Sequence, residues 1–228
     1  MAAPGDFVQD YIGGKQLLAG KSVYPADFTE IYKGLFKESP ELKEITVTAN
    51  VHPPLVSMRL SPLWLLSFKD AAVVWSLITI VCMFVIIILL LKSEDISLKY
   101  VSLIALFVFA WQPFQSNLML GQISILVTLF VIAGWFFYKK GHEAASGVFI
   151  ALAAMLKFYP GLLIVYFLIN KRYRAFLASI IAVGVILVLT LIVTRYDFFH
   201  FIFTIMPQDI RYWQADLVNF PINGFFSN

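Results

Sequence analysis

The run Ala71–Leu91 contains 21 residues without a charged side chain, and it limits the folds open to this chain more than any other feature. As a helix it would be about 31 Å long at about 1.5 Å per residue, which matches a hydrocarbon core of about 30 Å. Soluble domains carry about 25% charged residues, whereas this chain of 228 residues is 60% hydrophobic and 14% charged. The sequence therefore predicts an integral membrane protein.

Further apolar segments follow, and their interruptions indicate where each helix ends. Polar residues fill the second half of segment 100–119, so we expect that helix to end or break near Trp111. Segment 144–170 is interrupted by Lys157-Phe158-Tyr159-Pro160 and fits either one kinked helix or a hairpin. The predicted bundle covers 71–194, with helices at 71–91, 100–119, 121–138, a hairpin of 144–156 and 158–170, and 175–194.

The distribution of Lys and Arg distinguishes the hairpin from a single kinked helix. With a hairpin, the loops 92–99, 139–143 and 171–174 share one side and carry seven positive residues, against Lys157 alone at the opposite turns. With a single crossing this bias almost vanishes. The positive-inside rule therefore favours the hairpin. It also places residues 1–70, the 111–122 turn and the tail 195–228 on the non-cytoplasmic side.

Residues 1–70 contain no membrane span and are predicted to form an extracytoplasmic loop. Apolar spacing in 6–20 predicts an amphipathic helix on the membrane surface, and 55–68 a second interfacial piece with Trp64 at headgroup depth. A polar loop outside the membrane needs a preceding helix for export, and the sequence also ends in a loop. The expected fold is all-α, a polytopic transmembrane helix bundle of the GT-C kind that is truncated at both ends.

The predicted outer face gathers the side chains that could carry chemistry. Carboxylates, an imidazole, amides and cations over an apolar bundle could bind an anionic, lipid-attached substrate and remove a proton from it, although solvated loops contain the same groups. Lys157 is the sharpest candidate, because a lysine within an apolar hairpin is costly unless it snorkels or pairs with an anion. The candidates are Asp6, Asp10, His52, Gln122, Lys157, Tyr159 and Arg211.

Signatures of nucleotide and metal chemistry are absent from the sequence. It contains no Gly-x-x-x-x-Gly-Lys, Gly-x-Gly-x-x-Gly, His-Glu-x-x-His or Cys-x-x-Cys motif. Its single cysteine, Cys82, excludes an intramolecular disulfide and a cysteine-based metal site. The net charge of +3 is dispersed, which argues against a nucleic-acid partner. We therefore expect no cofactor and no metal; Asp6 and Asp10 alone are a weak metal signal.

Five short motifs occur in the order in which one enzyme family carries them, and between about Asp6 and Arg174 the chain resembles glycosyltransferase family 87. These are the polyprenol-phosphate-mannose-dependent mannosyltransferases of the GT-C superfamily. Ser124 departs from the pattern, because the family often has Asn there. The motifs are Asp6-Phe7 followed by Tyr11, Gly20-Lys21-Ser22-Val23-Tyr24, His52-Pro53-Pro54-Leu55, Gly121-Gln122-Ile123-Ser124 and Ala154-Met155-Leu156-Lys157-Phe158-Tyr159-Pro160.

The resemblance implies a polyprenyl-phosphate-sugar-dependent hexosyltransferase of the plasma (inner) membrane, with its site on the non-cytoplasmic side. It would move a hexose, mannose in this family, from a polyprenyl-phosphate donor to a lipid or glycan acceptor with inversion. Because flanking helices are missing, we expect this chain alone to be inactive. A rival interpretation is a membrane transporter or scaffold for polyprenyl-linked lipids without catalysis.

The resemblance also implies roles for individual residues. Asp6 occupies the position of the family's general base in the first outer loop, and Asp10 is the next candidate for that role. The remaining candidates are assigned to substrate binding. Lys157, helped by His52 or Arg211, would stabilise the departing phosphate, and Gln122 and Tyr159 would line the donor groove.

Overall fold

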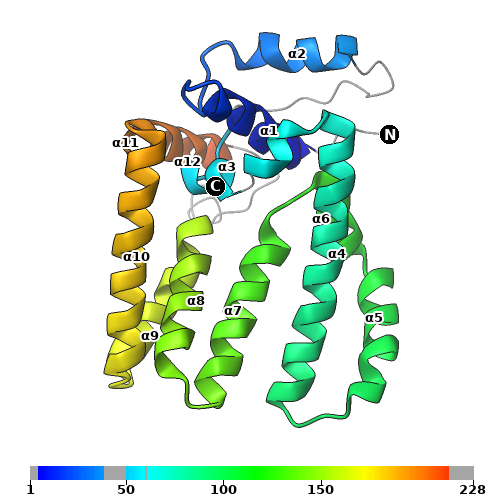
Figure 1. Ribbon diagram of the computed structural model, residues 1–228, viewed down its shortest axis with the longest axis vertical. Coiled ribbons are helices and arrows are strands. Elements are labelled where there is room, and N and C mark those ends of the chain that lie inside the picture. Colours follow the sequence, from blue (N-terminus) through cyan, green and yellow to red (C-terminus); the bar gives the residue numbers. More distant parts are fainter. Residues whose placement is uncertain (1–4, 39–49, 60, 216–228) are drawn as a thin grey trace, which may run out of the picture.

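A computed structural model describes residues 5–38, 50–59 and 61–215, and every regular element in these ranges is helical (Figure 1). The predicted all-α fold is therefore confirmed. The short helical turns are η1 (Ser61–Leu65), η2 (Leu98–Tyr100), η3 (Tyr159–Gly161) and the π-helical η4 (Phe201–Ile205). The α-helices are α1 (Gly5–Leu18), α2 (Phe28–Glu38), α3 (Pro54–Arg59), α4 (Phe68–Ser93), α5 (Val101–Ala110), α6 (Gln112–Leu120), α7 (Ser124–Lys139), α8 (Glu143–Leu156), α9 (Leu162–Ile169), α10 (Tyr173–Thr194), α11 (Asp197–His200) and α12 (Met206–Ala215).

Two of the described helices are long and apolar enough to cross a membrane: α4 with 26 residues and α10 with 22. At the start of α4, Ser67 acts as N-cap, and its hydroxyl oxygen accepts a hydrogen bond from the backbone N–H of Asp70. Helices α5 and α6 meet the same criterion together, but the chain bends by 69° between them, at Trp111. The described residues thus contain two candidate spans, or three if the bent pair crosses as one.

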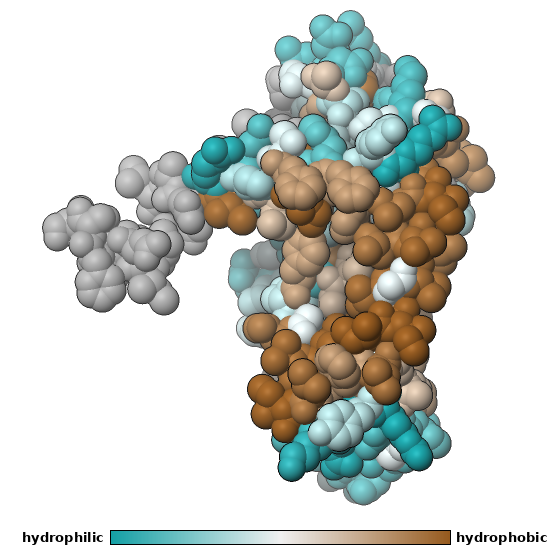
Figure 2. All heavy atoms as spheres, turned by 90° about the vertical axis from the view of Figure 1, so that its left-hand side faces the viewer, coloured by the Kyte–Doolittle hydropathy of each residue, from teal (hydrophilic) through white to brown (hydrophobic). Residues whose placement is uncertain are grey.

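The helices form a bundle whose ends are polar and whose side is apolar. Helices α4, α7, α8 and α10 pack in sequence beside one another (Figure 1). The connections that follow α4, α7 and α9 lie at one end, which we call the lysine-rich end, and α1, α2, α3 and α11 lie at the other. Figure 2 shows a hydrophobic band on the face formed by α9 and α10, between two hydrophilic ends. A bilayer core would cover such a band.

The chain reverses between α8 and α9, and Lys157 lies at this reversal. Helix α8 ends at Leu156, and Lys157 follows in an extended conformation with φ −143° and ψ 138°. The turn η3, which contains Pro160, leads into α9, and α9 returns toward the lysine-rich end (Figure 1). Segment 144–170 is thus two short helices, and Lys157 faces the end that carries α1 and α3.

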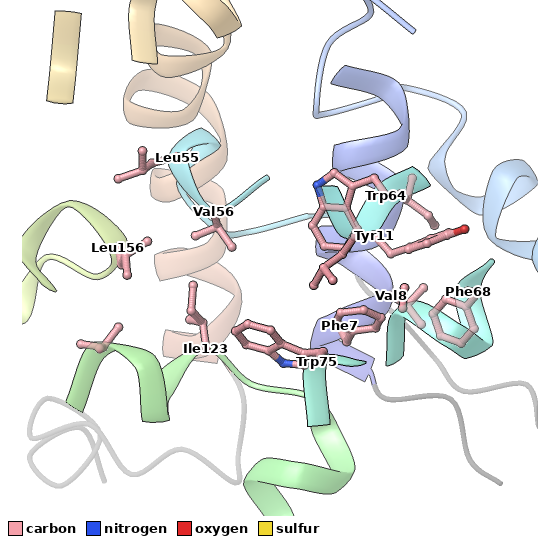
Figure 3. Packing of buried hydrophobic residues seen from close by; sticks show 14 of the residues in the cluster. Phe7, Val8, Tyr11, Leu55, Val56, Trp64, Phe68, Trp75, Ile123 and Leu156 are labelled. Atoms are coloured by element: carbon pink, nitrogen blue, oxygen red, sulfur yellow. The ribbon is translucent and has the colours of Figure 1, made fainter. Parts of the chain in front are cut away.

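The residues before α4 form a layer on this second end of the bundle. Phe7 of α1 is fully buried, and its ring lies 5.8 to 6.4 Å from the rings of Trp64, Phe68 and Trp75 (Figure 3). The indole N–H of Trp75 donates to the carbonyl oxygen of Gly121 at 2.9 Å, which ties α4 to the turn before α7. Aromatic packing and one buried hydrogen bond thus hold the layer against the bundle.

Trp64, for which we expect headgroup depth, has a side chain enclosed by protein. Trp64 is 0% exposed, and its indole N–H donates to the carbonyl oxygen of Ser57 at 2.7 Å. The ring packs directly on the backbone of α1, since a Cβ at Gly14 would overlap it. Residues 7 to 14 of α1 are all buried, so this helix also lacks the single buried face expected of a helix lying on a membrane.

Candidate functional site

A buried carboxylate and a histidine form the centre of the candidate site. Asp10 on α1 is 2% exposed, and its Oδ1 lies 2.8 Å from Nδ1 of His52, which precedes α3. The backbone N–H of His52 donates to Oδ1 of Asn50, and its carbonyl oxygen accepts a hydrogen bond from the Tyr24 hydroxyl at 2.6 Å. In the described part of the chain, no group hydrogen-bonds to Nε2 of His52. The imidazole is therefore held in place through Nδ1, and the backbone of His52 is held by Asn50 and Tyr24.

Four ionisable side chains influence one another around this histidine. Burial lowers the pKa of His52, whereas the charge and hydrogen bond of Asp10 and the charge of Asp6 raise it; Lys157 opposes them. The net result is a pKa of His52 above its ordinary value. Asp6 lies one turn before Asp10 on α1, and Lys157 contacts Ser124 at the start of α7. The structure thus brings together two carboxylates, an imidazole and an amine.

Asp6 is the more accessible of the two carboxylates. It lies in the first turn of α1, where the helix dipole favours a negative charge, and one turn before Asp10. Asp6 is half-buried, whereas Asp10 is buried and already accepts the hydrogen bond of His52. An approaching hydroxyl group can therefore reach Asp6 more readily than Asp10.

Lys157 is anchored to the start of α7. Its Nζ donates to the hydroxyl oxygen of Ser124 at 3.0 Å. Gln122, two residues earlier, accepts a hydrogen bond at Oε1 from Nδ2 of Asn117 at 3.3 Å. Between them the chain turns at Gly121, which has a positive φ of 66° that suits glycine. Gln122 and Ser124, which accepts the hydrogen bond of Lys157, thus both follow the turn between α6 and α7.

Two of the predicted site residues are not joined to this cluster. Tyr159 in η3 is 60% exposed, and Arg211 on α12 is also exposed. Among the described residues, no hydrogen bond or ion pair links either side chain to the Asp10–His52 pair. Their assignment to substrate binding stays a prediction.

Sequence reasoning missed Asp197, which supports the site together with Tyr24 of the second family motif. Asp197 is 7% exposed; its Oδ1 accepts from the hydroxyl of Ser22 at 2.6 Å, and its Oδ2 from the backbone N–H of Val23 at 2.8 Å. Tyr24 follows, and its ring stacks on Phe201. These contacts fasten loop 22–24 between α11 and His52. No spacing rule could have found Asp197, because 175 positions separate it from Ser22.

The Tyr24 hydroxyl donates a hydrogen bond to the backbone beside the site. Burial raises the pKa of Tyr24 well above its ordinary value, and the charges of Asp197 and Asp10 raise it further. The phenol therefore stays protonated and keeps its hydrogen bond to the carbonyl oxygen of His52.

Within the described ranges, no group of three or more His, Cys, Asp or Glu side chains is placed to hold a metal ion.

Comparison with known proteins gives one match. The model of glycosyltransferase family 87 matches residues 50–225, which is most of the chain. The matched range contains His52, Gln122, Lys157, Tyr159 and Arg211, and it begins after Asp6 and Asp10. No curated protein and no solved structure matches the chain.

Proposed function

The chain belongs to glycosyltransferase family 87, and from this premise we propose which transfer this membrane glycosyltransferase performs. It moves a hexose, with mannose as the first candidate, from a polyprenyl-phosphate donor to a lipid or glycan acceptor, on a GT-C-type bundle. The observation that carries the proposal is the cluster of Asp6, Asp10, His52 and Lys157 at one end of an apolar bundle. A lipid-linked sugar phosphate needs charged groups for its phosphate beside a hydrocarbon phase for its chain.

In the proposed reaction, the acceptor hydroxyl attacks the anomeric carbon on the face opposite the phosphate oxygen. A carbon–oxygen bond to the acceptor forms while the anomeric carbon–phosphate oxygen bond breaks, so the configuration inverts. Asp6 takes the proton of the hydroxyl as general base. The electron pair of the broken bond leaves on polyprenyl phosphate, and the ammonium group of Lys157 stabilises the charge that grows there.

The Asp10–His52 pair has a different role from Asp6 in this proposal. Asp10 raises the pKa of His52, which favours the imidazolium form and makes Nε2–H a donor for a phosphate oxygen. Asp10 is a weaker candidate for the base, because its Oδ1 is occupied by His52 and it is 2% exposed. Gln122 and Tyr159 are assigned to the donor groove, and Arg211 to stabilisation of the departing phosphate, on the strength of the family resemblance.

We further assign the protein to the plasma (inner) membrane, with the site on the non-cytoplasmic side. The lysine-rich end and the Asp10–His52 pair lie at opposite ends of the bundle, which supports this orientation (Figure 1). In this arrangement residues 1–70 and 195–228 are extracytoplasmic.

The proposal is tested with the protein expressed in membranes from its gene extended upstream and supplied with labelled polyprenyl-phosphate mannose and lipid or glycan acceptors. The native protein is expected to release polyprenyl phosphate and form a new glycoside, and Asp6→Asn at matched expression is expected to form none. Asp95→Asn is the control, because Asp95 is exposed at the lysine-rich end. Lipid-linked sugar that is moved without a new glycoside would indicate a carrier, and equal transfer by Asp6→Asn would exclude Asp6 as the base.

A further inference from the structure

Two neighbouring cavities at the lysine-rich end combine a basic rim with an apolar interior. One is an open cavity of about 870 Å³ whose lining includes His142, Lys171 and Arg174. The other measures about 500 Å³, lies between α4, α7, α8 and α9, and is lined almost entirely by apolar and aromatic side chains. Phe137 and Ala145 line the first cavity, and their sequence neighbours Tyr138 and Ser146 line the second. Helices α7 and α8 thus border both cavities.

The apolar cavity contains one polar group that lacks a partner. Ser146 is 0% exposed, and in the described part of the chain its hydroxyl has no hydrogen-bond partner. Burial of an unpaired hydroxyl among apolar side chains is unfavourable. A ligand with both a hydrocarbon chain and a hydrogen-bond acceptor would satisfy this group and fill the cavity.

The polar cavity carries positive charge that the protein does not neutralise. Lys171 and Arg174 line it and form no ion pair within the described ranges, whereas Glu143, which also lines it, pairs with Arg172. Helices α8 and α10 both begin at this cavity, and neither N-terminus receives a side-chain cap. Exposed backbone N–H groups at helix N-termini add to the attraction for an anion.

Two of the aromatic rings that line the apolar cavity lie beneath cationic groups. The guanidinium group of Arg172 lies over the ring of Tyr138 at 5.3 Å, and the ammonium group of Lys139 lies over the ring of Trp135 at 5.9 Å. Both rings line the apolar cavity. Tyr and Trp concentrate where hydrocarbon meets headgroups, so the boundary of the bilayer falls between the two cavities.

We propose that the two cavities together bind one anionic phospholipid of the surrounding membrane. Its phosphate lies over Lys171 and Arg174, one acyl chain enters the apolar cavity, and the Ser146 hydroxyl donates to an ester carbonyl. Basic pockets between transmembrane helices suit anionic headgroups. The site is separate from the proposed donor site, because it lies at the opposite end of the bundle from His52 (Figure 1).

The experiment measures lipid retention by the full chain purified in detergent, using native mass spectrometry after titration with phosphatidylglycerol or phosphatidylcholine. The native protein is expected to retain phosphatidylglycerol in preference. The double variant Lys171→Gln/Arg174→Gln is expected to bind it about 25-fold more weakly, from roughly a fivefold effect of each charge. The control Lys92→Gln/Lys99→Gln removes two exposed charges at the same end outside the cavities, and it should bind like the native protein.

Two further arms test whether the apolar cavity is occupied. Leu163→Trp fills that cavity and is expected to lower retention of phosphatidylglycerol without removing charge. Glycerol phosphate, which offers the same anionic group without a chain, is expected not to displace the lipid. Equal retention of both lipids, equal loss in the control variant, normal retention by Leu163→Trp, or displacement by glycerol phosphate would each overturn the proposal.

Discussion

Replacing Asp10 by Asn removes the charge that favours protonated His52 and nearly preserves the side-chain volume. In the native protein Asp10 Oδ1 lies 2.8 Å from Nδ1 of His52, and the carboxylate is 2% exposed, so water competes little for this hydrogen bond. A hydrogen bond to a charged group contributes about 1.5–3 kcal/mol, and about 1.4 kcal/mol of transition-state stabilisation corresponds to a factor of ten. If His52 donates to the leaving phosphate, Asp10→Asn should slow transfer about 10- to 150-fold.

The pH dependence distinguishes this role from a purely structural one. In the native protein the pKa of His52 is raised, since Asp10 and Asp6 together outweigh the effect of burial and of Lys157. Activity that needs the imidazolium is therefore complete below this pKa and is lost as the pH rises through it. Without the Asp10 charge the pKa falls, and the loss should begin at a lower pH. The assay is the initial rate of glycoside formation between about pH 5 and 9.

The control for this assay is Asp95→Asn, which should follow the native pH profile. A native-like profile in Asp10→Asn would refute the assignment of His52 as the protonated donor, even if the rate had fallen. The raised pKa of His52 also makes the stability of the fold depend on pH. The bound proton stabilises the fold below the unfolded pKa of histidine, and this contribution is lost as the pH rises through the folded value.

Two further predictions concern the packing around the site. Gly14→Ala should lower the free energy of unfolding by about 1–3 kcal/mol, because the added Cβ would overlap the Trp64 ring. Thermal unfolding in detergent measures this loss. Gly5→Ala is the control, since a Cβ at Gly5 meets nothing within 4 Å. Asp197→Ala should release loop 22–24, because it removes the hydrogen bonds that Asp197 accepts from Ser22 and Val23, and it should lower the free energy of unfolding by about 2–5 kcal/mol. Limited proteolysis should then cut loop 22–24 faster than in the native protein. An unchanged cleavage rate would contradict the role of Asp197 in holding the loop.

Membrane helices were predictable from the sequence because their signal is local. Hydrocarbon thickness sets a minimum length for an uncharged run, and 71–91 and 175–194 lie within α4 and α10. The break at Trp111 was predictable for the same reason, since Pro113 and neighbouring polar residues disfavour a continuous apolar helix there.

The environment of Trp64 shows where local patterns stop being informative. An indole at a membrane surface and an indole in a protein core both leave water, so hydropathy cannot separate them. The fold buries Trp64 because Gly14 lets the ring approach the backbone of α1. The contact joins two segments that are 50 residues apart, and no periodic pattern of residue types predicts it.

The candidate residues of the site were visible as residue types in ordered motifs, and their roles stay predictions. Lys157 could be named because a lysine within an apolar hairpin is costly, and Asp6, Asp10 and His52 because they occur in or beside the ordered motifs of the family resemblance. The Asp10–His52 hydrogen bond, the raised pKa of His52 and the Asp197 tether came only from the fold. They depend on distances between atoms that are 42 to 175 residues apart in the chain, and tertiary packing alone sets those distances.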